Sequence, residues 1–248
     1  MSLVAKLKGV RETAARMALL GELARNEDLA AFVSDLDTLG RAALERDPDA
    51  EEIMFALMRP SVVFADSERL NALADKAREL GAVLALQWLW SAEEWHAAAV
   101  RPPTAKTLGK TGSPSAQSLV DRAMASLTLG DRRALARRAD RDQLTRLAGD
   151  PDPVVVEHVL ANPRTTESLV VTACSRRPTV TTALETVIRS VWMLRRGVRL
   201  ALVHNPYLAV HSAVPLLFTL PLPEIAAVRD DESLNGRLRL TASRICIC

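Results

Sequence analysis

Residues 150–169 carry the strongest structural signal of the chain, and they read Asp-Pro-Asp-Pro-Val-Val-Val-Glu-His-Val-Leu-Ala-Asn-Pro-Arg-Thr-Thr-Glu-Ser-Leu. Asp152 is a favourable helix N-cap, and Pro153 suits the first helical position because its missing N–H is not needed there. Pro163 disfavours helical geometry at Asn162, so the first helix must end there. A second apolar segment then follows. The stretch therefore predicts two short helices separated by an Asn-Pro turn.

The Asn-Pro pair recurs later in the chain. Asn162-Pro163 is matched 43 residues on by Asn205-Pro206, and residues 199–207, Arg-Leu-Ala-Leu-Val-His-Asn-Pro-Tyr, repeat the middle of the first phrase. Further Pro and Gly residues divide the second half of the chain into about eight helices of roughly 7–14 residues each. Helices that short need a neighbour to bury their apolar faces, which stacked helix pairs provide.

The sequence also predicts how the chain is organised. Residues 101–117 include three Pro and two Gly with little to bury, so we expect a flexible linker there. The pattern before the linker is helical throughout. We therefore predict an all-α protein with a helical bundle over 1–100, the linker, and a helical-repeat domain, a short α-solenoid, over 118–248.

The order Asp-Pro, short helix, Asn-Pro, Thr, second helix resembles the bacterial leucine-rich-repeat variant, a relative in style of HEAT repeats. The resemblance covers about residues 140–245 and none of the N-terminal half. It implies a solenoid of about four HEAT-like helix pairs. The 43-residue spacing is nearer to HEAT length than to the family's shorter unit. One protein type in that family carries a cysteine-rich iron–sulfur segment, which three scattered cysteines do not supply.

Charge alone names no partner. The formal net charge is +2, with −3 over residues 1–117 and +5 over residues 118–248. All 18 basic residues of the second part are arginines. Codon bias in a GC-rich coding sequence is one explanation of this excess, and an anion-facing surface is the other.

Localisation and cysteine chemistry also follow from the sequence. No apolar run approaches the ~20 residues that a membrane helix needs, and the N-terminus lacks a secretory signal, so we expect a cytoplasmic protein. Cys174 lies in an apolar helical pattern and is expected in the core. Cys246 and Cys248 are interpreted as part of a frayed tail. A metal, redox or lipid-acceptor role for this pair is the alternative.

The sequence contains no catalytic signature. His158, His204 and His211 are the candidates for acid–base or metal chemistry, but Pro206 breaks the helical phase between the last two. No Ser/His/Asp arrangement, Gly-rich nucleotide motif or paired-carboxylate motif stands out. We therefore predict no catalytic residue, no metal and no cofactor.

The second half is expected to be a non-enzymatic scaffold or adaptor that binds another protein, because solenoids expose long concave faces. The alternative is a nucleic-acid-binding repeat protein that uses an Arg-lined surface, in the style of HEAT-like DNA glycosylases. Interleaved Asp residues and the modest net charge disfavour that alternative. The candidate interaction surface consists of Arg133, Arg137, Arg195, Arg196 and Arg199.

Overall fold

The chain is helical throughout the part that its computed structural model describes. The described residues are 3–10, 12–57, 67–100 and 119–247, with side chains left out at 13–14, 56 and 93–100. These ranges contain helices and no strand, which confirms the predicted all-α fold class. None of these helices is both long and apolar enough to cross a bilayer. The predicted linker, 101–117, lies outside the described residues.

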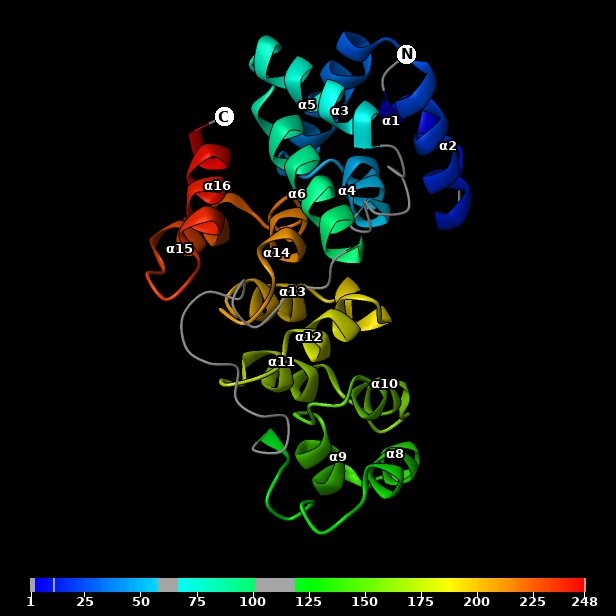
Figure 1. Ribbon diagram of the computed structural model, residues 1–248, viewed down its shortest axis with the longest axis vertical. Helices are drawn as coiled ribbons and strands as arrows, with labels where there is room; N and C mark the ends of the chain where they lie inside the picture. The colour runs from blue at the N-terminus through cyan, green and yellow to red at the C-terminus, as the bar shows by residue number, and fades with distance from the viewer. Residues whose placement is uncertain (1–2, 11, 58–66, 101–118, 248) are drawn as a thin grey trace. The chain divides into compact units, whose positions relative to one another are not determined.

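The helices form two compact units, one of Met1–Pro103 with Val210–Cys248 and one of Thr104–Ala209. The first unit is a helical bundle drawn from both halves of the sequence (Figure 1). Aspartates begin two of its helices, where Asp28 accepts hydrogen bonds from the N–H groups of Ala30 and Ala31, and Asp47 from that of Ala50. Its helices are α1 (Leu3–Leu7), α2 (Thr13–Asn26), α3 (Leu29–Leu44), α4 (Pro48–Ala56), α5 (Ser67–Leu80), α6 (Val83–Val100), α14 (Val210–Leu217), α15 (Leu222–Asp230) and α16 (Gly236–Ile247).

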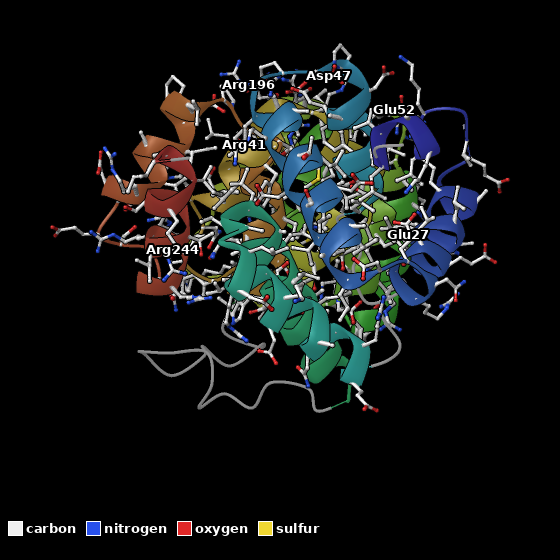
Figure 2. All side chains as sticks on the ribbon, turned by 90° about the horizontal axis from the view of Figure 1, so that it is seen from above. Glu27, Arg41, Asp47, Glu52, Arg196 and Arg244 are labelled. Carbon is white, nitrogen blue, oxygen red and sulfur yellow. The ribbon has the colours of Figure 1, made fainter. Side chains whose placement is uncertain are left out.

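Charged side chains tie the N-terminal helices of this unit to one another. Glu27, at the end of α2, accepts a hydrogen bond from Lys6 of α1. Arg16 of α2 donates to Glu52 of α4 at 2.9 Å. Figure 2 labels Glu27, Asp47 and Glu52 among the side chains of these helices. Most of these carboxylates are partly exposed, so the pairs add little stability beyond the apolar core beneath them.

Helix α6 packs on two sides. It contacts α3 and α5 as well as α14 and α16. Trp88 is buried, while the ring of the half-buried Trp90 lies 4.4 Å beneath the guanidinium of Arg237 in α16. Thr241 of α16 also donates a hydrogen bond to Gln87. These contacts group the last three helices with residues 1–103, whereas the sequence predicted one repeat domain running to residue 248.

The second unit is a run of short helices that follow one another as a stack (Figure 1). Its helix over residues 153–161 matches the sequence pattern. Asp152 accepts a hydrogen bond from the N–H of Val155 at 3.0 Å, Pro153 occupies the first helical position, and the helix ends before Asn162. The elements are α8 (Leu129–Arg138), α9 (Arg141–Leu147), α10 (Pro153–Ala161), α11 (Glu167–Ser175), α12 (Thr181–Ile188), the 3-10 helix η2 (Val191–Leu194) and α13 (Arg196–Val203).

Asn162 joins the end of α10 to the end of α8. Its side-chain amide donates to the carbonyl oxygens of Ala136 and Arg137 at 3.0 and 3.2 Å, and its Oδ1 accepts from the N–H of Arg164 at 2.9 Å. The side chain is buried, with the residue only 5% exposed. The last carbonyls of a helix have no partner within it, so this amide supplies the donors that α8 lacks. We call this arrangement an Asn clamp.

Asn205 makes the same clamp in the next copy. Its amide donates to the carbonyls of Cys174 and Arg176, at 2.6 and 3.1 Å, and its Oδ1 accepts from the N–H of Tyr207 at 3.0 Å. It therefore joins the end of α13 to the end of α11, as Asn162 joins α10 to α8. The 43-residue repeat in the sequence is thus also a repeat of hydrogen bonds.

We predict that Asn205→Ala lowers the free energy of unfolding of this unit by about 2–4 kcal/mol, because it leaves the buried carbonyl of Cys174 and the partly buried carbonyl of Arg176 without their donor. Hydrogen exchange measured by mass spectrometry should show faster exchange in peptides from α11 and α13. Asn71→Ala, on the exposed side of α5, is the control and should change stability by less than about 0.5 kcal/mol. Equal exchange in wild type and Asn205→Ala would contradict the clamp.

Candidate interaction surface

The five arginines predicted as an interaction surface have different environments. Arg133 donates through Nε and Nη2 to the two carboxylate oxygens of Asp152, at 3.0 and 2.8 Å. This bidentate pair lowers the pKa of the Asp152 carboxyl below its ordinary value. Arg137 donates through Nε to Nε2 of His158 at 3.1 Å. These two arginines of α8 are therefore bonded to side chains at or within α10.

Arg199 lies inside the unit. Only 4% of the residue is exposed, and its Nη1 donates to the carbonyl oxygens of Met193 and Leu194 at 3.2 and 2.9 Å. These are the last carbonyls of η2. The sequence placed Arg199 on the surface because Arg is usually exposed. Its position on the inner side of α13 instead makes it a structural donor that holds η2.

Arg195 and Arg196 are exposed at the start of α13, where Figure 2 labels Arg196. The Nε of Arg195 lies 3.9 Å from a carboxylate oxygen of Glu167. This pair is largely solvated, with more than 40% of each side chain exposed, so it contributes little to stability. Of the five predicted residues, Arg137, Arg195 and Arg196 are exposed, and Arg137 donates its Nε–H to His158.

Other arginines of the unit close helix ends. Arg164 donates to the carbonyls of Arg138 and Ala139, at 3.4 and 3.3 Å. Arg176 donates to the carbonyl of Thr145, at 2.6 Å, near the end of α9. A Cβ on Gly149 would lie 2.0 Å from the Arg176 guanidinium, so this glycine makes room for it. Much of the arginine excess in the second half therefore serves hydrogen bonding within the protein.

The 3-10 helix η2 is fixed on its inner side. The indole N–H of Trp192 donates to the carbonyl of Leu160, at the end of α10, at 2.8 Å. Met193 is buried, and the backbone N–H of Trp192 donates to the Ser190 hydroxyl at 3.2 Å. Together with the two hydrogen bonds from Arg199, these contacts hold the turn between α12 and α13.

The outer side of η2 presents two aliphatic side chains to solvent. Val191 is 76% exposed and Leu194 is 63% exposed. Residues three apart in a 3-10 helix lie above one another, so these two side chains are on the same side. Arg189, Arg195 and Arg196 flank them and are also exposed. We call this surface, Val191 and Leu194 with the three arginines, the η2 patch.

The sequence prediction did not include Val191 and Leu194. A run of Val-Trp-Met-Leu is typical of a buried segment, and nothing in its pattern marks two of the four as exposed. Comparing the two copies could have found them. At the 43-residue offset, Ala148-Gly-Asp-Pro151 stands where this apolar run stands in the second copy.

The η2 patch, as defined by its five residues, includes no histidine and no cysteine. His158 is bonded to Arg137, and burial lowers the pKa of His211, in the other unit, to about 4. Burial raises the pKa of the Cys174 thiol to about 12, which leaves it protonated and unreactive at neutral pH. Among the described residues, no group of three or more His, Cys, Asp or Glu side chains is placed to hold a metal ion.

A shallow cavity of about 410 Å³ lies at the N-terminal ends of α8 and α10. Its two charged side chains already have protein partners, because Arg132 donates to Asp150 at 2.7 Å and Asp152 accepts from Arg133. The cavity therefore offers no uncommitted charge to a ligand. It is lined by Val120, Leu127, Thr128, Leu129, Arg132, Pro151, Asp152 and Pro153.

Comparison with known proteins assigns no family to this chain: no family model, no curated protein and no solved structure matches it.

We predict that Arg199→Leu destabilises the second unit by about 2–3 kcal/mol, because the apolar side chain fills the space but cannot donate to the two carbonyls of η2. Arg195→Leu should change the free energy of unfolding by less than about 0.5 kcal/mol, since its ion pair is solvated. Chemical denaturation of the full chain, together with hydrogen exchange of η2 peptides, measures both variants. Equal losses would mean that Arg199 does not hold η2.

Proposed function

We propose that this chain is a cytoplasmic, non-enzymatic scaffold of HEAT-like or leucine-rich-repeat-variant-like helices, which binds another protein through its second unit. The observation that supports this proposal most directly is the η2 patch. Val191 and Leu194 are among the most exposed large apolar side chains of the described residues, and they sit on a turn that hydrogen bonds hold in place.

Exposed apolar residues are common singly, so the geometry of the pair matters. Burying one aliphatic side chain of this size contributes about 1.5–3 kcal/mol. A turn that is already fixed loses little conformational entropy when a partner covers it, so more of that energy appears as affinity. Arginine is also enriched at protein interfaces, where its stem packs and its guanidinium bonds carboxylates. The η2 patch combines these features.

Nucleic-acid binding is the second candidate, and the exposed Arg189, Arg195 and Arg196 favour it. Against it, Arg199 is buried and Arg133 is engaged by Asp152, which leaves fewer guanidinium groups for phosphates than the sequence predicted. Binding to a phosphate backbone depends on charge, so it would not be strengthened by the two aliphatic side chains between the arginines. Protein binding therefore remains the preferred proposal.

A photoreactive amino acid placed at Val191 or at Leu194 tests this function in cells of the source organism. We expect irradiation to produce a covalent adduct with one other polypeptide, identified by mass spectrometry. The same residue at Leu80 and at Leu222, which are also exposed but lie in the first unit, provides the control. Adducts no more frequent than at these controls, or adducts with nucleic acid alone, would contradict the proposal.

A further inference from the structure

Resting on the proposed function, we infer that the η2 patch binds an acidic amphipathic helix of the partner, with two aliphatic side chains three or four residues apart and Asp or Glu beside them. The aliphatic pair would cover Val191 and Leu194. The carboxylates would bond Arg195, Arg196 and Arg189.

Spacing supports a helical partner. A 3-10 helix rises about 2 Å per residue, so Val191 and Leu194 are separated by about 6 Å along its axis. Side chains at i and i+3 or i+4 of an α-helix are about 5–6 Å apart at their Cβ atoms. One such pair can therefore lie against both aliphatic side chains at once. A single extended strand would present alternate residues on the same face at about 6.4–6.8 Å, a slightly poorer match.

Charge supports an acidic partner. From Thr186 to His204 the chain carries four arginines and no Asp or Glu. Helices α11 and α12 contribute one carboxylate each. Glu167 of α11 lies 3.9 Å from Arg195, and the half-buried Glu185 of α12 interacts with Arg189, so the arginines of this segment still outnumber these carboxylates. A guanidinium and a carboxylate form strong bidentate hydrogen bonds, so acidic side chains beside the aliphatic pair would meet the flanking arginines.

The first copy shows that packing does not require these exposed groups. At the 43-residue offset its turn contains Asp150 and Asp152, which accept hydrogen bonds from Arg132 and Arg133 of α8. No residue from Asp150 to Pro153 is exposed. In the second copy Arg195 stands at the position of Asp152, so the charge is reversed. The apolar and basic character of the η2 patch is therefore an addition to the repeat.

Two other anionic surfaces fit less well. Phosphates of a nucleic acid would bond the arginines but leave Val191 and Leu194 uncovered. The indole N–H of Trp192 already donates to the carbonyl of Leu160. An anionic membrane would contact both kinds of side chain. Stable membrane anchoring, however, needs a larger apolar face than one turn with two aliphatic residues. Both surfaces enter the experiment as competitors.

The experiment selects peptides from a phage-displayed random library on the immobilised full-length chain at low salt. Phages that also bind Val191→Ser/Leu194→Ser are removed. We expect the remaining peptides to be net negative with two aliphatic residues three or four apart. Synthetic copies should bind at least about tenfold more weakly to Val191→Ser/Leu194→Ser and to Arg195→Glu/Arg196→Glu. Their affinity should also fall as salt rises, because the flanking contacts are electrostatic.

Arg122→Glu/Arg141→Glu is the matched control, since it reverses two exposed charges of the same unit outside the η2 patch and should leave the affinity within about twofold. A selection repeated on Arg195→Glu/Arg196→Glu should lose its preference for acidic peptides. Circular dichroism of each variant verifies that the helices are retained.

Several outcomes would overturn the inference. Selected peptides that are neutral or basic would exclude an acidic partner but leave the proposed function standing, provided that they still require Val191 and Leu194. An absence of any peptide that depends on the η2 patch would count against the acidic helix, while crosslinking in cells would still decide the proposed function independently. Tighter binding of duplex DNA or of anionic phospholipid vesicles, lost in Arg195→Glu/Arg196→Glu, would replace the protein partner with that surface.

Discussion

The Asn clamp is the interaction on which the second unit depends. Each helix of this unit is too short to be stable alone, and each ends with carbonyls that need donors. A carboxamide has two N–H donors and one carbonyl acceptor. Asn162 can therefore bond two carbonyls at the end of α8, and Asn205 two at the end of α11, while each also fixes its own turn. Asp would present only acceptors, and Ser has a single donor. The following proline keeps the Asn out of helical geometry, so its side chain can reach the neighbouring helix.

The sequence was sufficient to predict the all-α fold class and the bounds of α10, because these depend on local rules. Asp152 and Pro153 begin α10 and Asn162 ends it, as the conformational preferences of these residues predict. The targets of the Asn amides could not be predicted, since they are set by which helices stack together. Arg199 was misplaced on the surface for the same reason, because its burial depends on η2 packing above it. The exposure of Val191 and Leu194 was not predicted, because nothing in the sequence of a short turn shows whether its apolar residues are buried or exposed.

The two copies also show which parts of the repeat are constrained and which are free to vary. The clamp residue is Asn in both, and its burial is nearly the same. The turn before the helix that ends at the clamp Asn differs in chemical character between the copies. In the first copy it contains Asp150 and Asp152, which are bonded within the protein, and in the second copy it is η2, which is apolar and basic. Since the clamp fixes the stacking of the helices, the turn can change without loss of the fold. Recognition surfaces commonly occupy such variable segments on a rigid framework.

The composition of the first unit has a consequence for synthesis on the ribosome. Its helices α1–α6 emerge first, but α14–α16, which cover the second side of α6, emerge more than 100 residues later. At about 5–20 residues per second, that interval lasts roughly 5–20 s. During it, the face of α6 that carries Trp90 lacks its final cover from Arg237. The contiguous second unit can complete its own clamps within that interval, so the part of the chain made in the middle is free to fold before the part made first.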